Sequence, residues 1–213
     1  MDEFTLIKII IYAVPMILAI TVHEAAHGYA ARHFGDRTAE EKGRLSLNPF
    51  RHIDPIGTVL LPALLYFTHS AVLFGWAKPV PVSFARLRNP KADMLWVAAA
   101  GPASNLAMAI AWTLLASVTA SQGSSDAGSV LLAMAKIGMQ VNVMLMALNL
   151  LPLPPLDGGR ILVSILPPRA AYSVARIEPF GMFIMIALAY TGILWAIMQP
   201  IVVAAYMLLH LIY

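Results

Sequence analysis

A His-Glu-x-x-His pattern near the start of the chain has the residue types and spacing of a metal site. His23 and His27 lie four positions apart, and Glu24 lies between them. In an α-helix both imidazoles share one face, so they can reach a single ion while Glu24 accepts a proton from a water there. In a soluble helix these residues could simply form a solvated polar face. Here the almost wholly apolar stretch 7–22 precedes them, and ionisable groups at membrane depth are costly and usually functional.

A second polar cluster lies where a later apolar helix is interrupted. Residues 149–160 read Asn-Leu-Leu-Pro-Leu-Pro-Pro-Leu-Asp-Gly-Gly-Arg, and three prolines in four residues cannot continue an α-helix. The preceding helix descends far enough to place Asp157 near the same membrane face as His23. A carboxylate there needs a partner, and zinc could supply it. Since two His and one carboxylate leave the fourth zinc position open, this set is typical of a catalytic site.

The composition is that of a protein dissolved in lipid. Of 213 residues, 60% are hydrophobic and 12% charged, against about 25% charged in soluble domains. We expect an all-α polytopic membrane protein with about five to six transmembrane helices, forming a single domain over residues 1–213. The chain has no cysteine, so a metal must be held by His, Asp or Glu. The net charge of +3, spread over loops, argues against a nucleic-acid partner.

Apolar runs and charged loops predict the spans and their orientation. The first residues lack the features of a cleaved signal peptide, so we expect the first helix to be retained. Basic residues follow that helix and recur over 78–91 and 160–176, whereas 121–129 has none. The positive-inside rule therefore places the metal site near the cytoplasmic face. We predict helices over residues 4–33, 92–120 and 130–151, a fifth span over 179–198, and a last apolar segment, 200–213, that could be a sixth.

The apolar stretch 56–74 is long enough to cross a membrane, but a basic loop follows it. We favour a re-entrant or shallow segment that enters and leaves on the cytoplasmic side, with a true span as the alternative. Residues 78–82, Lys-Pro-Val-Pro-Val, are typical of an extended strand. This strand could pair with residues 43–47 as a small membrane-associated β element, and its edge could hold an unwound substrate strand. An ordinary proline-rich linker is the alternative.

Taken together, the motifs resemble the site-2 protease family of intramembrane zinc metalloproteases. The family's HExxH motif matches residues 23–27, and its NxxPxPxLDG motif matches residues 149–158 at every fixed position. Its GPxxN element matches Gly101, Pro102 and Asn105 in a run of small residues, which also lets another helix approach closely. The chain resembles the compact bacterial or archaeal members that have no PDZ insertion.

The resemblance implies a zinc metalloendopeptidase that hydrolyses peptide bonds of single-pass transmembrane proteins within the lipid bilayer, as in regulated intramembrane proteolysis. It implies one Zn²⁺ per chain, and it assigns Glu24 as general base. Substrate selection would then depend on the loops or on a regulatory partner protein. The implied metal ligands are His23, His27 and Asp157, and the implied substrate or oxyanion contacts are Asn105 and Asn149.

Several readings stay open from the residues alone. Asn105 could bind a neighbouring helix, orient a zinc ligand or contact substrate backbone. His52, which precedes Asp54-Pro55, could orient a site residue, line an entrance or belong to a turn. A transporter would also use broken helices and buried polar groups. A catalytically silent zinc-binding scaffold would keep the metal ligands but would not need Glu24.

Overall fold

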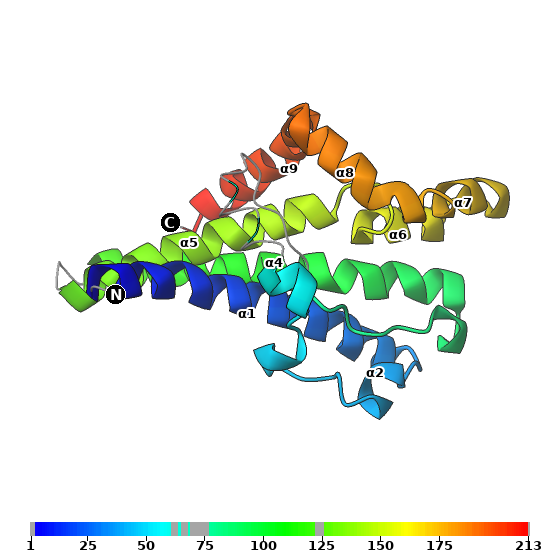
Figure 1. Cartoon of the computed structure of the whole chain (residues 1–213), viewed down its shortest axis with the longest axis horizontal. Helices are drawn as coiled ribbons and strands as arrows, with labels where there is room; N and C mark the ends of the chain where they lie inside the picture. The colour runs from blue at the N-terminus through cyan, green and yellow to red at the C-terminus, as the bar shows by residue number, and fades with distance from the viewer. Residues whose placement is uncertain (1–2, 61–63, 65–67, 69–76, 122–125, 213) are drawn as a thin grey trace.

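The computed structural model describes residues 3–60, 64, 68, 77–121 and 126–212. Three long helices, α1 (Glu3–His33), α4 (Pro90–Ser121) and α5 (Asp126–Asn149), run side by side along the longest axis of the molecule (Figure 1). Helix α4 packs against both of the others, and α1 also contacts α5. Helices suit this apolar sequence because lipid offers no partner to an unpaired backbone N–H or C=O group.

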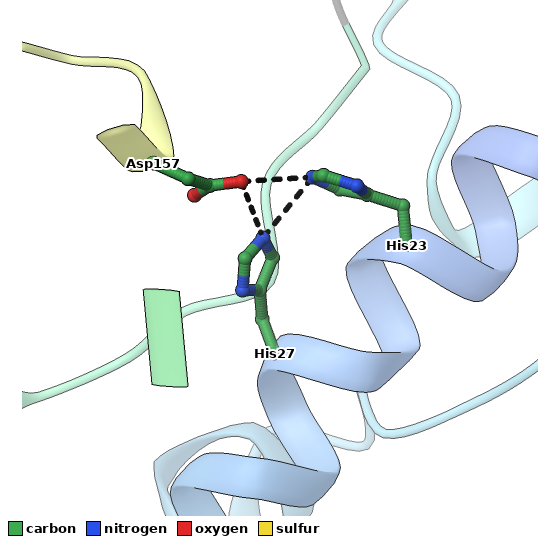
Figure 2. A group of neighbouring side chains, drawn as sticks. All are labelled: His23, His27 and Asp157. Atoms are coloured by element: carbon green, nitrogen blue, oxygen red, sulfur yellow. Dashed lines mark hydrogen bonds and ion pairs between the residues drawn. The ribbon is translucent and has the colours of Figure 1, made fainter. Parts of the chain in front are cut away.

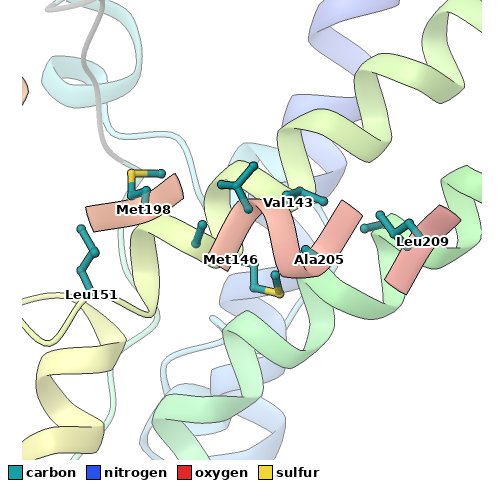
Figure 3. Packing of buried hydrophobic residues seen from close by; sticks show 9 residues of the cluster. Val143, Met146, Leu151, Met198, Ala205 and Leu209 are labelled. Atoms are coloured by element: carbon teal, nitrogen blue, oxygen red, sulfur yellow. The ribbon is translucent and has the colours of Figure 1, made fainter. Parts of the chain in front are cut away.

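A buried apolar cluster joins the C-terminal helix to this bundle. It combines α5 with α9 (Ile193–His210), and Ala109 adds a contribution from α4 (Figure 3). Val143 and Ala147 on α5 are completely buried, and Leu209 near the end of α9 is 2% exposed. The other buried members are Met146, Leu151, Met198, Val202 and Ala205.

The C-terminal half is divided differently from our prediction. Four short elements follow the proline-rich break: α6 (Asp157–Ile165), α7 (Pro168–Ala175), η4 (Glu178–Phe180) and α8 (Gly181–Tyr190). The predicted span over 179–198 is wrong, because the chain turns at Gly192, whose φ of 75° favours glycine. The predicted start of a separate segment at Pro200 is also wrong. Pro200 lies inside α9, and a proline is tolerated in an apolar membrane helix.

Five helical segments of the described chain are long and apolar enough to cross a membrane. This finding confirms the predicted all-α polytopic membrane fold with about five to six transmembrane helices. The fourth of them combines α7, η4 and α8, and the fifth is α9. The segments are Leu6–His33, Pro90–Ser121, Ala127–Asn149, Pro168–Tyr190 and Ile193–His210.

The loops between α1 and α4 contain short helical turns but no strand in their described residues: α2 (Thr38–Glu41), η1 (Pro49–Arg51), η2 (Pro55–Leu60) and η3 (Phe84–Arg86). The predicted pairing of 43–47 with 78–82 as a β element is absent from this part of the structure. Instead of a backbone ladder, the Arg44 guanidinium donates to the carbonyls of Lys78 and Pro79, at 3.0 and 3.4 Å.

The predicted re-entrant segment lies largely outside the described residues. The residues that precede and follow this segment are in contact, because the Lys78 N–H donates a hydrogen bond to the His52 carbonyl at 2.9 Å. A segment whose two ends lie side by side is expected to enter and leave the membrane at one face. The re-entrant arrangement of 56–74 stays a prediction, with this contact in its favour.

Basic residues from distant segments gather at the end of the bundle where α4 begins. Arg86 pairs with Glu41 at 2.7 Å, and the Lys91 ammonium donates to the Leu166 carbonyl at 2.6 Å. The first contact joins η3 to α2, and the second joins the first turn of α4 to the residue that follows α6.

Candidate metal centre

Three predicted ligands from two distant segments converge beside the helix bundle. His23 and His27 project from successive turns of α1, and Asp157 is the first residue of α6 (Figure 2). The two imidazole Nε2 atoms are 3.1 Å apart, and each is 3.3 Å from Oδ2 of Asp157. His23 and Asp157 are buried, and His27 is half-buried. The ligand atoms of all three lie within 4.8 Å of one another, as one metal ion requires.

The proline-glycine sequence after α5 brings Asp157 to this position. The chain folds back so closely that a Cβ on Gly158 would lie 2.3 Å from the Leu150 carbonyl oxygen. At Gly159, a Cβ would lie 2.2 Å from the Pro154 nitrogen. The prolines end α5 and the glycines let the next helix pack against the turn, which presents the Asp157 carboxylate to α1.

A glycine on α4 makes room for the two imidazoles. A Cβ on Gly101 would lie 2.5 Å from Cε1 of His23 and 2.5 Å from Nε2 of His27. Any other residue at this position would occupy the space of the rings themselves. The run of small residues predicted to allow a close helix contact therefore lies directly against the candidate site.

Each imidazole is held through the nitrogen that faces away from the convergence point. His27 Nδ1 lies 2.8 Å from the Val97 carbonyl, which can only accept, so Nδ1 carries the proton. His23 Nδ1 lies 2.6 Å from Oδ1 of Asn105 and donates to it in the same way. Both Nε2 atoms then turn a lone pair toward Asp157. Such partners on the remote nitrogen are usual for metal-binding histidines.

This arrangement of lone pairs fits a zinc ion. Among the described residues, the buried Oδ2 of Asp157 has no hydrogen-bond partner, although it lies close to both imidazoles. When the imidazoles are neutral and carry their protons on Nδ1, each Nε2 turns a lone pair toward this oxygen. Three electron pairs that face one another are unfavourable unless a cation lies among them. Two imidazole nitrogens and one carboxylate oxygen are a donor set that zinc binds.

Glu24 lies beside the two histidines on α1 and contacts a loop. Its Oε2 accepts a hydrogen bond from the Val80 N–H at 2.7 Å. Val80 belongs to the segment that was predicted to form a strand, so one backbone donor of that segment is engaged by the carboxylate. Gly28 permits this approach, since a Cβ there would lie 3.1 Å from Cγ1 of Val80.

The other predicted site residues lie at different distances from this centre. Asn105 is completely buried and contacts His23 directly. The Asn149 amide donates to the Leu145 carbonyl of its own helix at 3.0 Å, and its predicted substrate contact is untested. His52 is buried in the loops, where its Nε2 lies 2.9 Å from the Ser46 carbonyl.

Two groups that hold the histidines could not be predicted from the motifs, one in direct contact with His27 and one that acts on His23 through Asn105. The Val97 group is a backbone carbonyl, which every residue type has, so the sequence could not predict this contact. Asn142, completely buried on α5, accepts a hydrogen bond from the Asn105 amide at 2.9 Å. An asparagine in an apolar membrane helix is a signal that could have drawn attention to it.

Residues 113–192 match the family model of peptidase family M50. YwhC of Bacillus subtilis strain 168, named as a candidate zinc metalloprotease, is 35% identical over 193 residues, covering 87% of this chain and 84% of YwhC. The chain belongs to peptidase family M50, the site-2 protease family. Membership in this family confirms the predicted class of enzyme, a membrane-integral zinc metalloprotease of the site-2 type with Zn²⁺ as its cofactor.

Other M50 relatives are longer than this chain. Rip2 of Mycolicibacterium smegmatis, also named as a candidate zinc metalloprotease, is 29% identical over 175 residues, covering 82% of this chain and 64% of Rip2. Rip2 of Mycobacterium tuberculosis strain H37Rv is 30% identical over 172 residues, covering 81% and 63%. The chain thus spans slightly less than two thirds of these two relatives. No solved structure matches it.

Proposed function

We propose that this M50 chain is an intramembrane endopeptidase that hydrolyses peptide bonds of transmembrane proteins, as in regulated intramembrane proteolysis. The observation that carries the proposal is the convergence of His23, His27 and Asp157 beside Glu24, in a chain whose described residues include five helical segments able to span a membrane. In this proposal the three converging residues hold one Zn²⁺ and Glu24 is the general base.

Each side chain has a defined task in this mechanism. Zinc, when bound, supplies a Lewis acid that polarises a peptide carbonyl and makes water a better nucleophile. His23 and His27 present unprotonated Nε2 atoms, since their protons are on Nδ1. Glu24 takes the proton of the attacking water and passes it to the departing amine. The Val80 N–H fixes Oε2 of Glu24, and Oε1 is left for the proton.

The burial of Asn105 supports a task other than substrate binding. Its side chain is completely inaccessible, its Oδ1 accepts from His23, and its amide donates to Asn142. We infer that Asn105 orients His23. Contact with the substrate or the oxyanion remains proposed for Asn149, which is half-buried at the end of α5.

The charge distribution supports an active site near the cytoplasmic face of a bacterial membrane. Val97 lies seven residues into α4, about 10 Å from the end at which the basic loops gather. The positive-inside rule places such an end in the cytoplasm. We propose single-pass transmembrane proteins as substrates, cut near this face, with a regulatory partner or the loops selecting among them. We also propose that residues 1–213 form a single domain.

Replacement of Glu24 tests the function most simply. In cells whose only copy of the protein carries Glu24→Gln, we expect single-pass membrane proteins to accumulate uncut, with cleavage reduced at least about 100-fold because the general base is lost. The purified variant should keep about one zinc per chain, since the metal ligands are unchanged. Quantitative proteomics of the membrane fraction and metal analysis provide the two measurements.

Glu41→Gln is the matched control, because Glu41 is an exposed carboxylate that pairs with Arg86 away from the histidines. It should leave both cleavage and zinc content unchanged. Unaltered cleavage in the Glu24 variant would remove the base assignment. If the wild-type protein cuts no membrane protein yet binds zinc, the chain is a silent scaffold.

A further inference from the structure

A hydrogen-bonded chain of two asparagines links His23 to the backbone of α5. The Asn142 amide donates to the Gly138 carbonyl at 2.8 Å, and its Oδ1 accepts from the Asn105 amide at 2.9 Å. Oδ1 of Asn105 in turn lies 2.6 Å from Nδ1 of His23. All three side chains are buried, and both asparagines are completely inaccessible to solvent.

The direction of every hydrogen bond in this chain is fixed by its far end. The Gly138 carbonyl can only accept, so the NH₂ group of Asn142 must face it and Oδ1 must face Asn105. Asn105 must therefore present its NH₂ group to Asn142 and its Oδ1 to His23. His23 can satisfy that oxygen only with a proton on Nδ1. The lone pair on Nε2 then points to Asp157.

An asparagine at position 105 alone could not secure this result. Its amide has a donor end and an acceptor end of nearly equal size, and a half-turn would place the NH₂ group against His23. That group would favour the other imidazole tautomer, in which the Nε2 lone pair is replaced by a proton. The weak second contact of the Asn105 amide, 3.4 Å to the Ala19 carbonyl, is a lesser restraint.

We propose that Asn142 is a positioning residue of the metal centre, which fixes the proton of His23 on Nδ1 by controlling which end of the Asn105 amide faces the imidazole. The inference rests on the proposed role of His23 as a zinc ligand. Asn142 contacts none of the three predicted ligands. It also lies outside the family's HExxH, GPxxN and NxxPxPxLDG motifs.

The test is a double-mutant cycle read by zinc affinity, measured by competition with a chelator. Asn142→Leu removes both polar ends at similar volume and frees the Asn105 amide to turn. We expect the zinc dissociation constant to rise roughly 10- to 100-fold, as is usual when an outer partner of a metal-binding histidine is lost. Thr113→Val is the matched control, since the buried Thr113 hydroxyl donates to the Ala109 carbonyl of its own helix.

The second replacement of the double-mutant cycle is Asn105→Asp. A carboxylate has two acceptor oxygens and no donor, so Asp at 105 accepts from His23 whichever way it turns. In the Asn105→Asp background we therefore expect Asn142→Leu to cause no loss of zinc affinity, because the replacement also removes the Asn142 oxygen that would face the carboxylate. This comparison cancels the effect of the added charge, which both members of the pair carry. A merely structural role for Asn142 would instead weaken zinc binding equally in both backgrounds.

A measurement on the wild-type protein covers the case in which a variant fails to fold. Nitrogen NMR of histidine-labelled, zinc-free protein at mildly alkaline pH should show His23 protonated on Nδ1 and unprotonated on Nε2. The reverse assignment would overturn the proposal, as would equal losses of affinity in the two backgrounds. Failure of the wild-type protein to bind zinc would instead contradict the proposed function, so the two failures are distinguishable.

Discussion

For single residues, the proposed metal centre depends on the hydrogen bonds and protonation of three side chains as well as on their types. His23 and His27 are suited to bind a metal because their remote nitrogens contact an amide oxygen and a backbone carbonyl. Asp157 is useful because its Oδ2 has no hydrogen-bond partner in the described structure and faces both rings. The three donor atoms are thus preorganised for a cation by contacts within the protein.

The sequence could predict the side chains that converge but not the atoms that hold them. Four-residue spacing on a helix specifies that His23 and His27 share a face, and the proline-glycine break explains why a carboxylate returns to the same level. The Val97 carbonyl and Asn142 depend on how α4 and α5 pack against α1. The sequence pattern of a single helix does not predict how that helix packs against its neighbours.

At the scale of secondary-structure elements, the close contact between α1 and α4 determines whether the site can form. Gly101→Ala would place a methyl group 2.5 Å from atoms of both imidazoles, and both helices are continuous there. The rings must move, and displacement of two ligands should weaken zinc binding at least about 100-fold. Chelator competition on the purified variant measures the loss.

Thermal unfolding of the zinc-free variant is the control for this prediction. A methyl group that only disturbed helix packing would lower the stability of the metal-free protein and leave the zinc affinity of the folded fraction unaltered. That outcome would show that Gly101 serves the bundle rather than the metal centre.

Elements at the edges of the bundle were the least predictable. The long helices follow from continuous apolar runs, and their predicted bounds lie within a few residues of the observed ones. The C-terminal break could not be placed, because Pro200 is the stronger breaker by type but Gly192 is where the chain turns. The expected strand over 78–82 failed because side chains of Arg44 and Glu24, rather than another strand, bond its backbone.

For the molecule as a whole, the basic loops at one end of the helix bundle predict one orientation in the membrane. The chain has no cysteine, so single cysteines can be introduced without background. Ala85→Cys in η3 should react with an impermeant thiol reagent from the cytoplasmic side only, because it lies among the basic loops. Ser121→Cys, at the opposite end of α4, should react only from outside. Both positions are exposed.

Labelling of intact cells and of inverted vesicles checks this orientation. Reaction of both the Ala85 and Phe50→Cys positions from outside would reverse the proposed placement of the active site. Reaction of the Ala85 position from outside, with Phe50→Cys still reacting from the cytoplasm, would make residues 56–74 a true span.

We propose above all that two histidines and one carboxylate of this chain bind a single zinc ion. X-ray absorption at the zinc edge, on protein purified without a histidine tag, counts the imidazoles directly. We expect two imidazoles per zinc, with nitrogen and oxygen ligands at about 2.0–2.2 Å, and a large loss of bound zinc in Asp157→Ala. Any other number of imidazoles, or full zinc content without Asp157, would contradict it.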